Sequence, residues 1–217
     1  MATLKGLSQF KSKLIGGGAR PNLFEVTIPS FPGGINLGVQ GDGGGQFDAE
    51  KFTFLCKAAA LPASNISPID VPFRGRILKV AGDRTFDPWT VTIINDEDFQ
   101  LRVAFEKWMN AISRLDNNTG STDPGSYMTD AYVYQLGRGG AAGRFSKGSS
   151  DAENGSDTDV LRSYKFHYIF PTSISQIDLS YDSSDTIEEY TVEFQVQYWT
   201  AGKDSSNQSD LTGSLIS

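Results

Sequence analysis

A mainly β fold is predicted for this chain: a sandwich or small barrel of about eight antiparallel strands, with one packed helix and a long hairpin extension. Three features of the sequence support this prediction. Apolar and polar residues alternate in several short segments, which is typical of half-buried strands. One segment has a strong run of apolar residues at helical spacing. The 23 glycines, with many serines, indicate long polar connections between these elements.

The domain organisation follows from length and composition. The 217 residues suit one domain with large loops. We expect an N-terminal arm at 1–18, a β domain at 19–199 and a polar C-terminal tail at 200–217. The arm has weak helical spacing and ends in glycines, so it is either a contact arm or a frayed terminus. Within the domain, the expected loops are at residues 29–46, 61–79 and 137–159.

The first two strands are expected at residues 22–28 and 52–61. Residues 22–28 alternate apolar with polar side chains over most of their length. In the second segment, Phe52, Phe54 and Cys56 are expected on one face of the strand. Glycine and proline dominate the intervening residues, which therefore form a loop.

Residues 61–79 form an apolar extension with too few neighbours in sequence to bury it. Its prolines stiffen the segment, so less conformational entropy is lost when it docks. Such exposed apolar segments usually mark a contact surface. We therefore expect contact with another copy of the chain, the alternative being a loop folded back on its own core. The candidate contact residues are Leu61, Pro62, Ile66, Ile69, Val71, Pro72, Phe73 and Arg74.

Residues 89–93 alternate as a half-buried strand, and a helix is expected directly after them. Asn95 is the expected N-cap, and acidic residues at 96–98 would complement the helix dipole. Burial of one large apolar side chain contributes roughly 1.5–3 kcal/mol, so an apolar stripe can anchor the helix to a sheet. We interpret this stripe as core rather than as a cofactor site. Its members are Leu101, Phe105, Trp108, Met109 and Ile112.

The remaining strands are expected in the C-terminal half. Residues 128–136 and 164–170 each alternate apolar with polar side chains. A final hairpin is expected from strands at 177–182 and 189–198, joined by a turn.

Composition excludes several classes of function. A net charge of −7 argues against a surface that grips nucleic acid or an anionic membrane, and no apolar run approaches the ~20 residues of a membrane span. The single cysteine, Cys56, is expected to be a buried thiol in a chain that folds in a reducing cytosol. His167 is the only histidine and has no partner in sequence for a triad or metal site.

No enzyme or cofactor motif is present, and we expect no catalytic, cofactor or metal site. The acidic residues Asp151, Glu153, Asp157 and Asp159 miss the spacing of a calcium loop and are interpreted as solvated.

Four blocks of the sequence resemble the tail tube proteins of contractile-tailed bacteriophages. The central block is AGDRTFDPWTVTIINDEDFQLRVAFEKW at 81–108. The others, in the family's order, are ARPNLFEV (19–26), FTFLCKAAALPAS (52–64) and YIFPTSISQIDLSYDSSDTIEEYTVEFQVQYW (168–199). Together they cover most of residues 19–199.

The resemblance implies a structural virion protein of the phage tail. Subunits of this family form sixfold rings whose sheets join edge to edge, and the rings stack into a tube. The implied partners are further copies of the chain, the tail sheath, and the baseplate and terminator proteins. DNA would pass through the lumen without specific binding, and assembly would take place in the host cytoplasm. The chain departs from the simplest members in its loops at 29–46 and 137–159 and in its tail.

The strands that face the lumen stay open at this point. The family pattern suggests segments near 52–61, 77–85, 129–137 and 161–169, whereas the most acidic alternating faces lie at Asp178/Asp182 and Glu189/Glu193. A net negative lumen would let DNA slide, because lysine or arginine would hold its phosphates. The lumen candidates are Asp83, Gln135, Glu189 and Glu193.

Three alternative functions remain. A tube-like baseplate or terminator protein of the same fold would occur at one level of the tail. A secretion tube of the type VI kind is conceivable from its relation to tail tubes. A monomeric carbohydrate-binding β-sandwich belongs to a different class and would need exposed aromatic residues at one edge.

Overall fold

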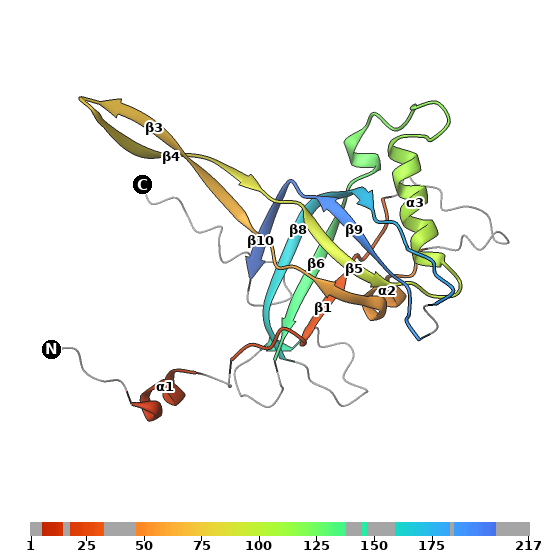
Figure 1. Ribbon diagram of the computed structural model, residues 1–217, viewed down its shortest axis with the longest axis horizontal. Helices are drawn as coiled ribbons and strands as arrows, with labels where there is room; N and C mark the ends of the chain where they lie inside the picture. Colours follow the sequence, from red (N-terminus) through yellow and green to blue (C-terminus); the bar gives the residue numbers. More distant parts are fainter. Residues whose placement is uncertain are drawn as a thin grey trace. The chain divides into compact units, whose positions relative to one another are not determined.

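The computed structural model describes residues 6–14, 18–32, 47–137, 145–146, 159–182 and 185–202, and Figure 1 shows its elements. Outside these ranges lie the acidic residues at 151, 153 and 157, which the sequence predicts to be solvated, most of the loops at 29–46 and 137–159, and most of the C-terminal tail. Two compact units are present. The first contains Met1–Glu25, Val133–Tyr164 and Thr200–Ser217, and the second contains Val26–Tyr132 and Lys165–Trp199.

The prediction of a mainly β, antiparallel fold is confirmed. The main sheet has the strand order β1-β6-β8-β9-β5-β2, with β7 and β10 pairing with β8 beside this path. Within the described residues, the path runs from β1 to β2 without closing on itself. The strands are β1 (Phe24–Thr27), β2 (Cys56–Ala59), β5 (Trp89–Ile94), β6 (Thr129–Leu136), β7 (Phe145–Ser146), β8 (Asp159–Ile174), β9 (Glu189–Gln195) and β10 (Tyr198–Gly202).

The long hairpin is a separate two-stranded sheet of β3 (Ser64–Phe73) and β4 (Arg76–Phe86). β3 follows β2, and β4 leads into β5 after a break at Asp87 and Pro88. The hairpin therefore continues the antiparallel β2–β5 pair outward, and Figure 1 shows it extending from the β2–β5 end of the second unit. At its tip, Arg74 and Gly75 both have positive φ, 46° and 80°, as a tight two-residue hairpin turn requires.

The core of the second unit lies between the β5–β9 pair and helix α3 (Gln100–Ile112). On both strands alternate residues are buried, because successive side chains point to opposite faces. The Phe194 ring of β9 lies 5.9 Å from Phe105 and 6.1 Å from Trp108. The Trp108 indole also donates a hydrogen bond to the Tyr127 carbonyl at 2.7 Å, so its polar atom is satisfied within the core.

The predicted helix exists, but its predicted start is wrong. The helix begins at Gln100, after Phe99 in a left-handed conformation (φ 52°), and no acidic residue lies in its first turn. Asn95 is not its cap; the buried Asn95 side chain donates to Glu188 Oε2 at 2.9 Å. Asp96 and Asp98 instead pair with Lys51 from another helix, so a tertiary contact replaces the capping role.

A second helix, α2 (Ala49–Leu55), occupies the first four residues of the segment predicted as a strand at 52–61. Asp48 caps it by accepting a hydrogen bond from the Lys51 backbone N–H at 2.9 Å. Phe52 is buried against Phe47 and Phe105, whereas Phe54 is exposed. The prediction that Phe52, Phe54 and Cys56 share a strand face is therefore wrong, and the strand β2 begins only at Cys56.

Other differences from the prediction are local. The segment expected as a strand at 177–182 has no strand; β8 ends at Ile174 and β9 begins at Glu189. The last strand is divided at Val196 and Gln197, and β10 reaches Gly202, within the segment expected as a polar tail. The arm contains the short helix α1 (Leu7–Lys13), and a one-turn 3-10 helix, Pro124–Ser126, precedes β6. In the described part of the chain, no helix is long and apolar enough to cross a membrane.

Candidate assembly surfaces

The β3–β4 hairpin presents one apolar face. In the ladder, Ile69 lies opposite Val80, Val71 opposite Leu78, and Phe73 opposite Arg76. Residues directly opposite in an antiparallel pair share a face, so these apolar side chains form one continuous surface. The other face carries the Asp70–Lys79 ion pair, 2.8 Å long, with Pro72 opposite Ile77. We call the first of these the apolar face: Ile69, Val71, Phe73, Leu78 and Val80.

Every residue from Asn65 to Ala81 is exposed. The candidate contact residues Leu61, Ile66, Ile69, Val71, Pro72, Phe73 and Arg74 are all exposed, and Pro62 is half-buried. Three residues of β4 that lie opposite β3 are exposed as well and are absent from the sequence-predicted contacts: Ile77, Leu78 and Val80. Gly75 is the sequence feature that could have indicated them, because a glycine turn at that position pairs residues 69–73 with residues 76–80.

A bulge fixes the middle of the hairpin. The register shifts between Ile66 and Pro68, so that Gly82 and Asp83 of β4 lie opposite the single residue Ser67. A Cβ atom at Gly82 would lie 2.5 Å from the Ser67 carbonyl oxygen, which no side chain can tolerate unless the backbone moves. Asp83, one of the lumen candidates, is exposed at this bulge.

Side-chain hydrogen bonds from three residues hold the base of the hairpin. The Trp89 indole donates to the Ala60 carbonyl at 2.9 Å, and the Trp199 indole donates to the Ala63 carbonyl at 3.3 Å. The Asn65 amide donates to both oxygens of Asp87, at 2.9 and 3.1 Å. Since Trp89 also stacks on Phe166 with ring centroids 4.5 Å apart, the core and the hairpin base share one residue.

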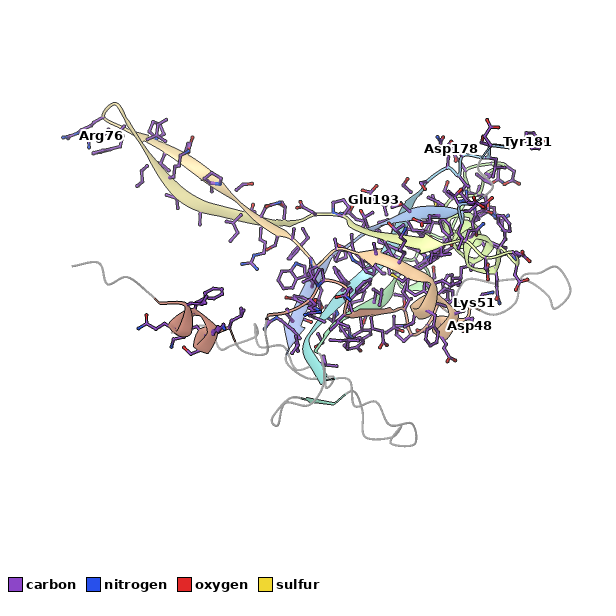
Figure 2. The ribbon with its side chains drawn as sticks, turned by 60° about the horizontal axis from the view of Figure 1, so that its bottom comes forward. Asp48, Lys51, Arg76, Asp178, Tyr181 and Glu193 are labelled. Carbon is purple, nitrogen blue, oxygen red and sulfur yellow. The ribbon has the colours of Figure 1, made fainter. Side chains whose placement is uncertain are left out.

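The sheet face opposite α3 is polar. Thr90 lies opposite Glu193 and Thr92 opposite Thr191 in the β5–β9 ladder, while Trp89, Val91, Val192 and Phe194 point into the core. We call Thr90, Thr92, Thr191 and Glu193 the polar face. Figure 2 labels Glu193 on β9. At the end of the same ladder, Glu189 forms an ion pair with Lys57 of β2, so its charge is compensated.

The other lumen candidate, Gln135, belongs to the first unit. Its amide donates to the backbone carbonyls of Arg20 and Leu23, at 2.8 and 2.6 Å, and the Leu136 N–H donates to Leu23. These bonds tie the start of β1 to β6. The half-buried Gln135 therefore has a structural role.

The helix stripe is divided by burial. Leu101, Phe105 and Trp108 are buried together with Ala104, whereas Met109 and Ile112 are only half-buried. Aromatic rings of Phe31, Phe47 and Phe52 complete this cluster.

The surroundings of Cys56 and His167 shift the pKa values of their side chains without creating a reactive site. Burial raises the pKa of the half-buried Cys56 thiol to about 12, so the nucleophilic thiolate is disfavoured. Burial and the Lys165 ammonium lower the pKa of His167, although the Asp130 carboxylate acts to raise it. His167 stacks on Tyr198 with centroids 4.4 Å apart. Among the described residues, no group of acidic, histidine or cysteine side chains is placed to hold a metal ion.

Comparisons with known proteins agree with this arrangement. The phage tail tube protein family model matches residues 19–202. The chain is 34% identical over 181 residues to tail tube protein gp19 of Enterobacteria phage T4, spanning 83% of this chain and 90% of that protein.

Two solved structures share the fold. The baseplate of the anti-feeding prophage, 6-fold symmetrised, contains a chain that matches with a TM-score of 0.54 and 11% identity, covering 85% of this chain and 95% of that one. A chain of the tube-terminating cap of the same particle matches with a TM-score of 0.52 and 17% identity, covering 86% and 91%.

Proposed function

This chain belongs to the phage tail tube protein family and is a structural component of a phage tail, and we propose that its copies form hexameric rings that stack into a tube for the genome. The exposed apolar face of the hairpin is the observation that carries this proposal. No described segment of the chain covers this face, and burial of the face by another copy would lower the free energy.

The open sheet supports ring formation. The strand path begins at β1 and ends at β2, so each end strand presents a ladder edge that another strand can occupy. A head-to-tail contact between such edges closes into a ring when the rotation between copies divides a full turn. The sixfold value rests on the family and on the 6-fold symmetrised baseplate that shares the fold.

The polar face suits the lumen. Thr90, Thr92, Thr191 and Glu193 offer hydroxyls and a negative charge but no lysine or arginine. The neighbouring Lys57 is paired with Glu189, so a duplex near this face meets no uncompensated cation that would hold its phosphates and can slide. The lumen is therefore proposed at the β5–β9 polar face, with Asp83 of the hairpin as the competing position.

The remaining roles follow from this placement. The chain acts by assembly and not by catalysis; its proposed partners are the sheath, the baseplate and the terminator, and assembly takes place in the host cytoplasm. The segment 19–199 forms the tube domain, with the arm as a further contact between copies.

Negative-stain microscopy and size-exclusion chromatography of the concentrated protein test the proposal. We expect rings or hollow rods, and we expect the double substitution I69D/L78D to abolish them by placing carboxylates on the apolar face. The matched control is L115D, since Leu115 is 96% exposed at the end of α3 and outside the hairpin. A strict monomer at every concentration would overturn the proposal and favour the carbohydrate-binding alternative.

Labelling of intact virions separates the tube from the baseplate and terminator alternatives. Antibody raised against the chain should bind along the whole length of tails whose sheath has been removed. Label at one end only would assign the chain to the baseplate or the terminator.

A further inference from the structure

The segment 178–182, between β8 and β9, is exposed throughout in its own unit. Leu179 is 80% exposed and Tyr181 is fully exposed. Asp178 and Asp182 alternate with them, and neither carboxylate forms an ion pair with a described residue. The segment has the alternation of a strand, yet it has no ladder in the described structure. We call Asp178, Leu179, Tyr181 and Asp182 the acidic loop.

The hairpin tip has the complementary character. Phe73 is 65% exposed, and Leu78, on the same face of the hairpin, is exposed too. The tip carries Arg74 and Arg76, neither of which forms an ion pair with a described residue, whereas Lys79 further back is paired with Asp70. The Arg74 guanidinium lies 5.3 Å from the centre of the Phe73 ring. The tip therefore combines two uncompensated positive charges with exposed apolar side chains.

The tip and the acidic loop belong to the same unit and lie at opposite ends of it. Figure 2 labels Arg76 at one end and Asp178 and Tyr181 at the other. β3 has 10 residues, which at about 3.4 Å each places the tip roughly 30 Å beyond the hairpin base. The two surfaces of one chain therefore do not meet, but they can meet between copies.

We infer that the hairpin tip of one copy docks on the acidic loop of the next copy, where Arg74 and Arg76 pair with Asp178 and Asp182. Guanidinium groups bind carboxylates through paired hydrogen bonds, and Phe73 and Leu78 of the apolar face then cover Leu179 and Tyr181. The contact also gives the acidic loop a strand to pair with. A two-stranded hairpin leaves the outer edge of each strand unpaired, and an extended segment can add to such an edge.

Such a contact is head-to-tail and leaves one free tip and one free acidic loop at the two ends of every assembly. When the rotation between copies does not close, such a contact builds an open stack rather than a closed ring. The inference rests on the proposed function, since it names the receiving surface for a contact that the tube requires.

Charge reversal tests the pairing. We expect R74E/R76E and D178R/D182R each to raise the critical concentration for rod formation by at least about tenfold. The quadruple variant carries both reversals, so its tip and acidic loop are complementary again, and we expect rods to return. The matched control is R114E/D116R, which reverses exposed charges at the end of α3 and should polymerise as the unmodified chain does.

Cysteine cross-linking gives a readout that does not depend on loss of assembly. In a chain carrying C56A, R74C and Y181C, oxidation should join successive copies into a ladder of covalent multimers. The single variants R74C and Y181C in the C56A chain should give dimers at most.

The outcomes separate this inference from the proposed function. If the unmodified chain forms no rods, the proposed function fails. If it forms rods while both double reversals polymerise normally, or a folded quadruple variant stays monomeric, the docking of tip on acidic loop is wrong although the tube stands. A multimer ladder from the double-cysteine chain supports the contact, and its absence in assembled rods contradicts it.

Discussion

Thr90 of β5 and Glu193 of β9 lie directly opposite each other on the sheet face turned away from α3. Their neighbours Trp89 and Phe194 are also paired, on the buried face of the same strands. A charge introduced at Glu193 therefore stays outside the core, so this position reports on the lumen without disturbing the fold.

We expect E193K to slow DNA ejection from phage assembled with the variant chain. Each lysine adds an attraction to phosphate that weakens as salt rises, so ejection should recover at high ionic strength. E193Q removes the negative charge without adding a positive one and should have a smaller effect. E106K is the control at an exposed position of α3, where the lost Arg102 pair costs only about 0.3–0.5 kcal/mol.

Comparison of E193K with D83K assigns the lumen. Slower ejection with E193K alone supports the polar face, and slower ejection with D83K alone would move the lumen to the hairpin. An unchanged ejection rate with both variants would contradict an electrostatic role for either position.

Gly82→Ala should impair rod assembly while the core remains folded. The new Cβ would lie 2.5 Å from the Ser67 carbonyl oxygen, a backbone atom, so β4 must shift at the bulge. The shift alters the direction of the apolar face but leaves the β5–β9 core untouched. Rod formation is followed by light scattering and the core by thermal unfolding. S67A, which removes only a side-chain hydroxyl at the same bulge, is the control, and normal polymerisation of G82A would refute the claim.

Trp108→Ala should lower the free energy of unfolding by about 3–5 kcal/mol, the usual cost of truncating a fully buried large aromatic residue. W108F keeps most of the packing but leaves the Tyr127 carbonyl without its donor, so about 1–3 kcal/mol should be lost. Urea unfolding of dilute, unassembled protein measures both changes. A loss below about 1 kcal/mol for W108A would show that α3 does not anchor the core.

The free energy of unfolding of the unassembled chain should decrease as the pH is lowered, partly because of His167. Burial and Lys165 lower its folded-state pKa, so the folded chain binds this proton less readily than the unfolded chain, whose histidine has a pKa of about 6.5. The contribution of neutral His167 to folding stability is therefore complete above about pH 6.5, and it is lost as the pH falls below that value.

Unfolding of the unmodified chain and of H167Q at pH 7.5 and 5.5 measures this effect. Because His167 is the only histidine, H167Q should lose less stability between the two pH values. Equal losses in the two proteins would contradict a depressed histidine pKa. The groups that face the ring include Lys165, Asp130, Tyr168 and Tyr198.

Several elements were predictable because they depend on local periodicity. The alternation at 89–93 and 189–195 marks β5 and β9, and the helical spacing from Leu101 to Trp108 marks α3. Prolines and apolar residues at 61–79 indicated a hairpin extension, and β3 and the start of β4 lie in that segment. Tertiary contacts overruled other signals. Asp96 and Asp98 pair with Lys51 instead of starting the helix, and Phe52 reaches the core from α2 rather than from a strand.

In the acidic loop, the local sequence pattern and the tertiary structure give different results. Its residues alternate as in a strand, but a strand forms only when a second strand pairs with it. Its own unit supplies no such partner strand in the described residues.

By itself, the sequence determined that the chain is mainly β, with one strong amphipathic helix and an apolar extension, because the spacing of apolar side chains fixes which local structures can bury them. Only the tertiary structure decided where α3 begins, that Phe52 lies on a helix, and which hairpin residues share a face. Those outcomes depend on competition among distant partners for the same core and the same hydrogen bonds, and that competition is resolved only when the segments meet.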